Sequence, residues 1–591
     1  MQKAQALHRF ALCLCVIAIL TILVIWQLYR NDRQVALVAG GNNQGTTLNQ
    51  TSDIKPENKI STLIIPHHDI VKDIRQQFLQ KIAPSVTSPS TIILLSPNHY
   101  DLGLGDIQTT DQTWQLGDKT ISPDEIVLSS LSGLASNEPG SFANEHGVRN
   151  VLADIWQVFP NARIVPIILK RTSTKDEITS LNEQLKQTCS SCLLIASVDF
   201  SHYQTALLAD LHDQTTERLL DSLNVDELLH DAEVDSPPAL ALAANWASAQ
   251  QTERFVLDKH TNSGVVSKLP NQETTSHFFG YYATGEKTVP LNSVNFIIGG
   301  DMMFGRMIAH TFLKDGLWHS VDQLGERLFW GTDASIVNLE GPVSDSPVKD
   351  NIEPNNLIFN FPPQTIQALQ FLHVNAAGQG NNHSGNAGNS GLETTRKLLL
   401  NANFQTFGGP SGFDPTHVAT FNGSGLTLDV LGVNLLPSQP DLTKEIAKLK
   451  TNPTHRIMVF YHGGNEYQSN HSSAQERMAH AWIDAGADIV IGAHPHVIQD
   501  SEIYKGKPIF YSLGNLLFDQ TFSKETQQGL LVAGSFSDTG ISVFAQPVQS
   551  KNNKPAPILG STKSQLLEAI YRPFTQYLRD TPSGSIIEIP N

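Results

Sequence analysis

The sequence predicts an α/β fold: an N-terminal transmembrane helix, followed by two globular units in which strands and helices alternate. Three observations lead to this prediction. Residues 10–28 are apolar and carry no charge, while residues 60–285 and 290–545 each alternate apolar strand-like runs with amphipathic helical stretches. The 591 residues suffice for two or three domains, and a hydrophobic content of 40% can fill large cores.

The first element is the apolar run 10–28, FALCLCVIAILTILVIWQL. A helix of this length can span a bilayer core. A cleaved signal peptide is the alternative, but the following YRNDRQ fits a cleavage site poorly. Basic residues lie on both sides of the run, so they hardly decide its orientation. We expect a single-pass membrane protein with a short cytoplasmic arm and its body on the extracytoplasmic side.

The predicted organisation has five parts: an anchor (1–30), a flexible linker rich in Asn, Gln, Thr and Gly (31–59), a first domain (60–285), a second domain (290–545) and a C-terminal tail (546–591). In the second domain, Ser473 and Glu476 have the spacing of a capping box, and Gly486 predicts the end of that helix. In the tail, KSQLLEAIYRPFTQYLRD predicts a helix broken at Pro573.

The net charge and the four cysteines indicate which kinds of binding site this chain is unlike. Asp and Glu together number 57 against 40 Lys and Arg, a net charge of −17, which argues against a nucleic-acid binder because such surfaces are basic. Cys13 and Cys15 lie in the apolar run and indicate packing. Cys189 and Cys192 form a lone CxxC, for which a local disulfide fits an exported domain better than a zinc site.

Five apolar strands of the second domain lead into side chains that can bind metals. These side chains are Asp301, Glu340, Asn382 with His383, His462, and His494 with His496. Side chains at the carboxyl ends of strands in layered α/β folds converge on one crevice, and this donor set suits Zn, Mn or Fe. Taken singly each would be a cap or a satisfied polar residue, but five such strand ends together favour a metal site. Two ions sharing a carboxylate could activate water and bind a leaving oxygen.

The segment 488–499, DIVIGAHPHVIQ, is the most specific of these strand ends. Its apolar half predicts a core strand, and Pro495 limits the backbone freedom between the two histidines. We expect an extended chain here, so that His494 and His496 point the same way and reach different ions.

These motifs closely resemble those of CapA-type proteins of capsule and poly-γ-glutamate synthesis, which belong to the calcineurin-like metallophosphoesterase superfamily. The matching stretches, within about residues 292–520, are GGDMMFGR, NLEGPV, GNNHSGNAGNSGLETT, YHGGNEY and AGADIVIGAHPHVIQ with IYKGKPIFYSLGNLLFD. The resemblance implies a four-layer α/β/β/α metallophosphatase-like sandwich with two divalent metal ions, Mn, Zn or Fe.

The resemblance also implies a role for each residue. Asp301 and His496 would bind the first metal, and Glu340 would bridge the two metals. The remaining ligands of the second metal would be Asn382, His462 and His494. His383 would protonate a leaving group or orient the substrate, and Arg306, Asn338 and Glu466 would contact the substrate. The wider superfamily has Asp-x-His where this chain has Met303, and Asp at the position of Glu340, so the first metal loses a nitrogen ligand.

The first domain repeats the pattern, with His67, His99 and His202 at three strand ends and Asp199, Glu145 and His146 nearby. Three histidines suggest one metal with an open coordination sphere. The stretches LIIPHHD, IILLSPNHYD and LLIASVDFSHY resemble the Memo-like family, also called AmmeMemoRadiSam system protein B and related to class III extradiol dioxygenases. The three histidines would then face the metal. Family members often carry a cysteine in the block seen here as HTNSG, where this chain has Ser263, which argues against copper or redox chemistry.

The apolar run 10–28 predicts a protein of the bacterial cell membrane. The resemblance to CapA-type proteins implies a role in the synthesis, export or anchoring of a surface polymer, for which we expect a metal-dependent, hydrolase-like site. We expect the protein to meet the membrane, an anionic polymer such as poly-γ-glutamate or its precursor, and polymer synthase or export proteins, but no nucleic acid. Three alternatives stay open: a non-catalytic, metal-stabilised scaffold of a synthase complex, a generic metallophosphoesterase, and a protein whose working part is the Memo-like unit.

Overall fold

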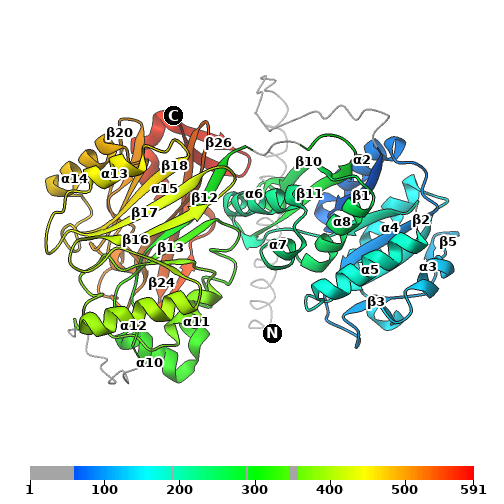
Figure 1. Ribbon diagram of the computed structural model, residues 1–591, viewed down its shortest axis with the longest axis horizontal. Coiled ribbons are helices and arrows are strands. Elements are labelled where there is room, and N and C mark those ends of the chain that lie inside the picture. Colours follow the sequence, from blue (N-terminus) through cyan, green and yellow to red (C-terminus); the bar gives the residue numbers. More distant parts are fainter. Residues whose placement is uncertain (1–58, 190, 288–290, 345–356) are drawn as a thin grey trace, which may run out of the picture. The chain divides into compact units, whose positions relative to one another are not determined.

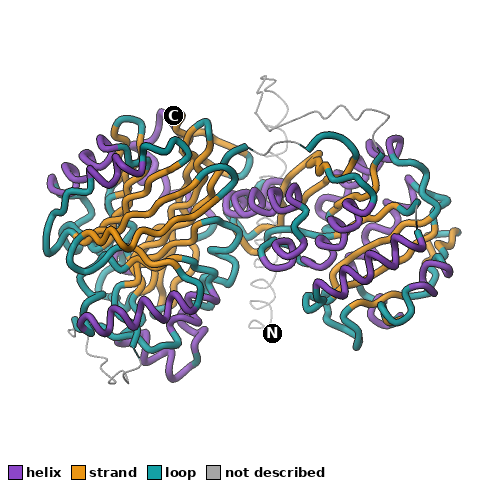
Figure 2. The backbone as a smooth tube through the Cα atoms, in the orientation of Figure 1, coloured by secondary structure: helices purple, strands orange, loops and turns teal. Residues whose placement is uncertain are grey.

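The computed structural model describes residues 59–189, 191–287, 291–344 and 357–591 (Figures 1 and 2). Within this part of the chain, no helix has the length and apolar character of a membrane span. The longest described helix, α6 (Ala206–Ser222), has 17 residues, about 26 Å at the usual rise, whereas a bilayer core is about 30 Å thick. The prediction of a transmembrane helix and a single-pass membrane location is therefore corrected. Residues 10–28, on which it rested, and the predicted linker up to residue 58 lie outside the described residues.

The N-terminal region is built around a nine-stranded sheet. In sheet order its strands are β10 (Arg254–Asn262), β11 (Thr274–Ala283), β1 (Ile60–Ile65), β8 (Leu193–Ser197), β2 (Thr91–Pro97), β7 (Arg163–Leu169), β3 (Ile107–Thr109) and β6 (Ser136–Asn137), with β9 (His202–Gln204) on β11 and a separate hairpin of β4 (Trp114–Leu116) and β5 (Lys119–Ile121). β1, β8, β2 and β7 run parallel and are buried along almost their whole length. Continuous apolar runs are typical of parallel strands covered on both faces.

Helices cover both faces of this sheet. They are α2 (Lys72–Ile82), α3 (Glu125–Ser130), α4 (His146–Val158), α5 (Lys175–Thr188), α6, α7 (Val225–His230), α8 (Pro237–Ala249) and α9 (Ser263–Ser267). One core cluster contains apolar side chains of α2 and α4, and another contains those of α5 and α8. Cys189 and Cys192 form a disulfide at the end of α5, as the lone CxxC predicted.

The C-terminal region contains two sheets. The ten-stranded sheet has the order β15 (Gln405–Phe407), β14 (Ala376–Gly378), β13 (Ala334–Leu339), β12 (Ser293–Met302), β23 (Gln528–Ser537), β24 (Gly540–Lys551), β27 (Gly584–Pro590) and β26 (Leu578–Thr581), with β22 (Asn515–Leu517) on β12 and β25 (Lys554–Pro557) on β24. The six-stranded sheet has the order β16 (Phe413–Asn422), β17 (Thr427–Asn434), β18 (His455–His462), β19 (Ile489–Ala493), β21 (Lys507–Phe510) and β20 (Ser501–Tyr504). Mixed α/β architecture is confirmed.

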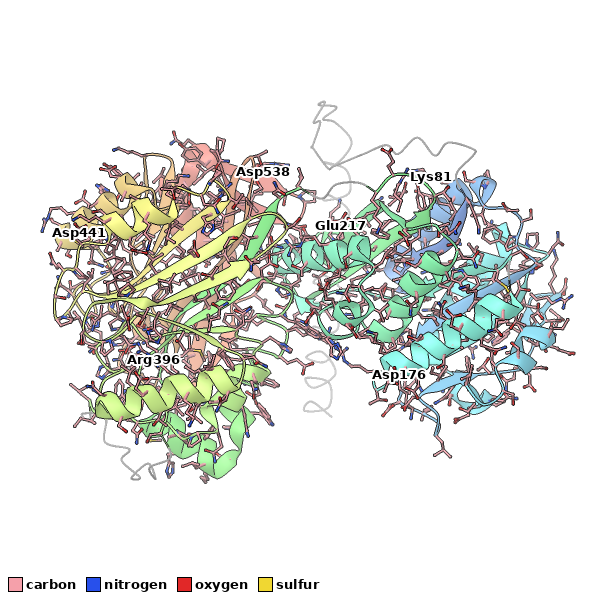
Figure 3. The ribbon with its side chains drawn as sticks, in the orientation of Figure 1. Lys81, Asp176, Glu217, Arg396, Asp441 and Asp538 are labelled. Carbon is pink, nitrogen blue, oxygen red and sulfur yellow. A yellow bond between two sulfur atoms is a disulfide. The ribbon has the colours of Figure 1, made fainter. Side chains whose placement is uncertain are left out.

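The two sheets pack face to face, because one core cluster combines Phe296 and Ile298 of β12 with Val430 of β17 and Met458 of β18. The outer face of the larger sheet carries α10 (Arg306–Asp315), α11 (Thr365–Phe371) and α12 (Gly388–Asn401), and that of the smaller sheet carries α13 (Thr443–Leu449) and α14 (Ser473–Ala485) (Figure 1). The region thus has helices, two sheets and helices in succession. Exposed charges such as Lys81, Asp176 and Asp441 lie at the outside (Figure 3).

Two local predictions can be compared with the helices directly. The capping box of α14 is formed by Ser472 and Gln475, one residue earlier than the predicted pair, whereas Gly486 ends the helix in the left-handed conformation as predicted. In the tail, α15 (Gly560–Tyr571) gives way to a 3₁₀ turn at Arg572–Tyr577, which confirms the break at Pro573.

Candidate functional site

Strands of the two C-terminal sheets end at one place. β12 and β13 run parallel with Asp301 beside Asn338, and β18 and β19 run parallel with His462 beside Ala493. Glu340 directly follows β13, and the two histidines of the HPH segment follow β19. Because the carboxyl ends of parallel strands face the same edge, side chains far apart in sequence form one buried cluster, which we call the C-terminal centre.

Asp301 lies in this centre, fully buried and surrounded by nitrogen donors. Its Oδ1 accepts a hydrogen bond from Asn338 at 2.7 Å, and its Oδ2 accepts one from the backbone N–H of His494 at 3.2 Å and lies 3.3 Å from Nδ1 of His496. Burial opposes the charge, but hydrogen bonding to His496 and the charge of His462 outweigh it, so the pKa of Asp301 falls to about 2. The carboxylate is therefore ionised near pH 7, as a metal ligand must be.

Glu340 is also fully buried, yet neither of its carboxylate oxygens has a hydrogen-bond partner among the described residues. Its Oε1 lies 3.8 Å from Nε2 of His462, 3.8 Å from Nε2 of His496 and 3.9 Å from Nε2 of His383. Burial, and then the charge of Asp301, raises the pKa of Glu340 well above its usual value. Three imidazoles around an unsatisfied carboxylate are a donor set that a divalent cation fits.

The HPH segment is not extended, so that expectation is wrong. His494 and His496 take left-handed backbone conformations with φ of +98° and +57°, a strained state for residues with a Cβ atom. This turn brings His496 against Asp301, while the ring of His494 lies 4.8 Å from that of His462. The two imidazoles reach the centre through the turn rather than through the alternation of a strand.

The two histidines also differ in charge. Burial, and then the charge of His496, lowers the pKa of His494 to about 4, and its buried Nδ1 has no hydrogen-bond partner within the described ranges of the chain. For His496, burial is outweighed by the charge of Glu340 and by hydrogen bonding to Asp301, which raise the pKa to about 9. His494 is thus neutral at pH 7 and could bind an ion without losing a proton, whereas His496 would have to release one.

Amide side chains orient these ligands. Asn338, predicted to contact the substrate, is buried; it donates to Asp301 and lies 3.2 Å from Nδ1 of His462. The Oδ1 of Asn515, which sequence reasoning missed, lies 3.0 Å from Nδ1 of His496. Both are positioning residues, because they form hydrogen bonds to the side chains that are predicted to bind metal.

Three further predicted residues border the centre. Asn382 is exposed, and its Oδ1 lies 2.7 Å from Nε2 of His462, beside the other donors as its assignment requires. His383 is partly buried and faces Glu340. Glu466 is exposed, and its carboxylate, together with the two imidazoles of the HPH segment, can hold a metal ion.

Arg306 and Met303 occupy the turn between β12 and α10. Arg306 pairs with Asp519, including an Nε–Oδ2 hydrogen bond of 3.2 Å, and its guanidinium lies 5.2 Å from the ring centre of Phe359. Its charge is therefore already compensated within the protein. Met303 is buried, and its sulfur accepts a hydrogen bond from the backbone N–H of Gly305 over 2.9 Å.

A second cluster, the N-terminal centre, lies at strand ends of the nine-stranded sheet. The Nε2 atom of His67 is 3.2 Å from Oδ2 of Asp199 and 3.3 Å from Oδ2 of Asp235. His99 lies with its Nε2 3.6 Å from the same Asp235 oxygen and its Nδ1 2.6 Å from Glu145. The structure thus brings the predicted His67 and His99 together around buried carboxylates.

His146 and His202 border the N-terminal centre. The ring of His146 stacks on that of His99 at 3.9 Å, and burial, followed by the charge of His99, lowers the pKa of His146 to about 4. The buried Nδ1 of His202 has no hydrogen-bond partner among the residues described; burial lowers the pKa of His202, while the charges of Asp235 and Asp199 oppose this. Groups of residues that can hold a metal ion therefore occur in both regions.

Sequence reasoning missed Asp235. It precedes α8 in the stretch EVDSPP, away from any strand end or histidine, so only the fold brings it to His67 and His99. Ser263, at the position where a family cysteine was expected, contacts Thr274 and the backbone of Thr275 instead.

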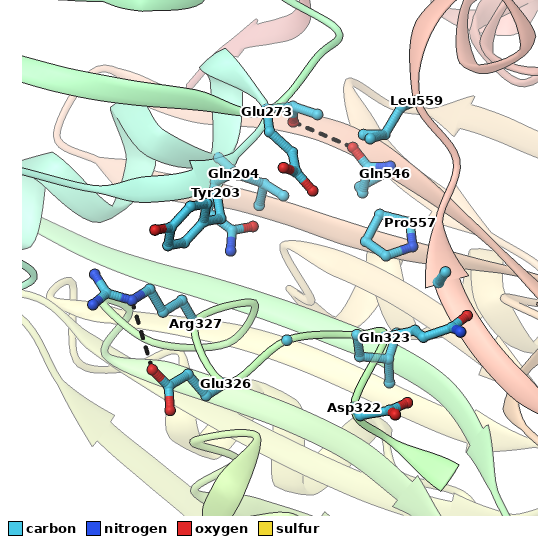
Figure 4. Close-up of a pocket in the computed structure, with 15 residues that line it drawn as sticks. Tyr203, Gln204, Glu273, Asp322, Gln323, Glu326, Arg327, Gln546, Pro557 and Leu559 are labelled. Atoms are coloured by element: carbon cyan, nitrogen blue, oxygen red, sulfur yellow. Dashed lines mark hydrogen bonds and ion pairs between the residues drawn. The ribbon is translucent and has the colours of Figure 1, made fainter. Parts of the chain in front are cut away.

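The structure also contains a pocket of about 510 Å³ (Figure 4). Tyr203, Glu273, Arg327 and Gln546 are among its lining residues. None of the predicted metal ligands lines this pocket, so the metal chemistry is better sought at the two centres.

Comparison with known proteins also separates the chain into an N-terminal and a C-terminal region. Residues 295–520 match the family model of the bacterial capsule synthesis protein PGA_cap, and residues 42–241 match that of the Memo-like protein. The capsule biosynthesis protein CapA of Bacillus anthracis is 28% identical over 309 residues, which are 49% of this chain and 73% of the relative. The PGA biosynthesis protein CapA of Bacillus subtilis (strain 168) is 28% identical over 323 residues, 51% of this chain and 84% of the relative.

The N-terminal region has relatives of its own. A MEMO1 family protein of Caldivirga maquilingensis is 25% identical over 193 residues, which are 30% of this chain and 67% of the relative. The chain therefore joins an N-terminal region that matches the Memo-like family to a C-terminal region that matches the bacterial capsule synthesis family PGA_cap.

Proposed function

We propose that the C-terminal centre is a metal-dependent hydrolase- or transferase-like site that acts in the synthesis, export or anchoring of a surface polymer such as poly-γ-glutamate. One observation carries the proposal: the buried carboxylate of Glu340 lies within 3.9 Å of three imidazoles and has no hydrogen-bond partner in the part of the chain that the structure describes. The family supports the pathway, and the donor set supports the chemistry.

The chain's residues fit two divalent ions, Mn, Zn or Fe. Asp301 and His496 would hold one, His462, His494 and Asn382 the other, and Glu340 would lie between them. When bound, such ions polarise an acyl or phosphoryl oxygen and lower the pKa of water. The protein supplies fixed, ionised or neutral donors for this purpose, with Asn338 and Asn515 holding their orientation.

His383 fits an orienting role better than the role of an acid. Its Nδ1 lies 3.0 Å from Oδ1 of Asn386, and its ring stacks on Phe359 at 4.1 Å, so the imidazole is held in place. Burial lowers the pKa of His383, so its ring is neutral near pH 7. A neutral imidazole carries a single N–H, and the hydrogen bond to Asn386 uses it, so no proton is left for a leaving group. We expect it to position a substrate oxygen or accept a proton.

Metal analysis of the purified full chain tests the proposal. The wild type should carry more bound metal than Glu340→Ala, and Glu445→Ala, a substitution on α13 outside both centres, should keep the wild-type content. A wild-type protein that neither contains nor takes up divalent metal would overturn it.

A non-catalytic scaffold is the second candidate, because Met303 replaces a nitrogen ligand of the wider superfamily and turns to the backbone. The scaffold and the catalytic site can be distinguished by measuring the polymer that cells make when His383→Ala is their sole copy of the protein. A scaffold that only contacts synthase or export proteins should keep its output without this imidazole, whereas a catalytic site should lose it. Turnover of simple phosphate esters with added Mn, without any effect on polymer, would instead favour a generic phosphoesterase.

A further inference from the structure

A second pair of imidazoles lies beside the carboxylates of the N-terminal centre. His68, next to His67 in sequence, has its Nδ1 3.1 Å from Nε2 of His277 in β11. Together with Asp199 these two histidines form a group whose ligand atoms all lie within 4.8 Å of one another. His67 forms a separate group of the same kind with Asp199 and Asp235. Asp199 is thus common to both groups.

The two oxygens of Asp199 differ in their surroundings. Oδ2 lies 3.2 Å from Nε2 of His67, whereas Oδ1 is buried and has no hydrogen-bond partner among the described residues. Asp199 is only 4% exposed, so water does not solvate this oxygen freely. A buried carboxylate oxygen without a partner is unfavourable, and a cation beside it would remove the deficit.

The spacing of the nitrogens fits an ion as well. Two ligands on a tetrahedral ion with bonds of about 2.0–2.1 Å are about 3.3 Å apart. The separation between His68 and His277 is 3.1 Å, and His67 lies 3.2 Å and 3.3 Å from its two carboxylates. A simple hydrogen bond between the two imidazoles would explain the first distance, but it would leave the Asp199 oxygen unsatisfied.

We propose that the N-terminal region binds two divalent transition-metal ions, the second held by His68 and His277, with Asp199 shared between the two. Imidazole with carboxylate suits Zn, Mn, Fe or Co. A shared carboxylate holds two ions about 3.5–4 Å apart, as in two-metal sites. His277 is fully buried and His68 partly exposed, so the second ion would enter from the side of His68. This inference is independent of the function proposed for the C-terminal centre.

The test uses the full chain with the C-terminal centre disabled by Glu340→Ala and His462→Ala, so that bound metal reports the N-terminal region. The protein is loaded with Mn, its metal content is measured, and the electron paramagnetic resonance spectrum is recorded. We expect two equivalents and the spectrum of a coupled ion pair. Adding His68→Ala or His277→Ala should remove one equivalent and leave the spectrum of a single uncoupled ion. Adding Asp199→Asn should weaken both ions.

His230→Ala, at the exposed end of α7, is the matched control and should change nothing. His68 is partly exposed, so its variant keeps the test valid if the fully buried His277→Ala fails to fold. One equivalent in the background protein, unchanged by His68→Ala, would overturn the proposal in favour of a hydrogen-bonded imidazole pair. Two equivalents without coupling would overturn the shared role of Asp199.

Discussion

The two centres compensate their buried charges differently. In the N-terminal centre two histidines face carboxylates directly, His67 with Asp199 and His99 with Glu145. In the C-terminal centre amide side chains bond to the candidate ligands Asp301 and His496, and the carboxylate of Glu340 has no hydrogen-bond partner among the residues that the structure describes. Without a metal, Asp199 and Asp235 of the N-terminal centre each keep one oxygen paired with His67 and one oxygen without a partner among the described residues, whereas Glu340 of the C-terminal centre has neither oxygen paired. We expect the C-terminal centre to depend more strongly on its ions.

Glu340→Ala should produce the largest effect, because it removes the donor that lies between the predicted ions. A ligand at a thousand times its Kd stabilises a fold by about 4 kcal/mol. Adding a chelator should therefore lower the unfolding midpoint of the wild type by several degrees, and most of this response should vanish in Glu340→Ala. Asp235→Ala in the N-terminal centre should keep most of it. Thermal unfolding with and without chelator measures both, and equal losses in the two variants would contradict the comparison.

Asn515→Ala should have the next largest effect, by releasing His496 from its hydrogen bond. Losing such an orienting partner typically weakens metal binding by about 10–100-fold. Asn515→Asp keeps an acceptor oxygen and should restore much of the affinity. Calorimetric titration of the chelated protein with Mn provides the readout. If both variants bind like the wild type, amide support of the C-terminal centre is not needed.

Removing one buried carboxylate from the metal-free protein should raise the free energy of unfolding in the C-terminal centre and lower it in the N-terminal centre. The folded pKa of Glu340 is raised, so this group costs stability increasingly as the pH rises above its unfolded value, and Glu340→Gln should stabilise the chelated protein at pH 8 by about 1–3 kcal/mol. The pKa of Asp235 is lowered: burial opposes its charge, but hydrogen bonding to His99 outweighs burial. Asp235 thus stabilises the fold above its unfolded pKa, and Asp235→Asn should destabilise it. Urea unfolding under chelation compares the two, and equal signs would refute the contrast.

Strand periodicity was enough to predict the α/β class and most of the C-terminal donors, because ligands at strand ends carry a local signal. Asp235 had no such signal, since its role depends on a loop that only tertiary packing brings to His67. The left-handed turn at His494 and His496 was missed for another reason: sequence patterns indicate strands, not strained backbone angles. The capping box lies one residue earlier than predicted, because Ser472 and Ser473 carry the same hydroxyl group and the sequence pattern does not distinguish them.

The pH response of the N-terminal centre should be the smallest effect and the most specific one. Burial would lower the pKa of His99, but hydrogen bonds to Asp235 and Glu145 raise it to about 9. A raised histidine pKa stabilises the folded state fully below about pH 6.5, and this contribution is lost as the pH rises toward 9. For a side chain 21% exposed we expect about 1–2 kcal/mol in the chelated protein. Glu145→Gln should flatten the profile between pH 6.5 and 9 while leaving the Glu340 effect, which begins at lower pH, in place; an unchanged profile would mean that His99 is neutral in the folded protein.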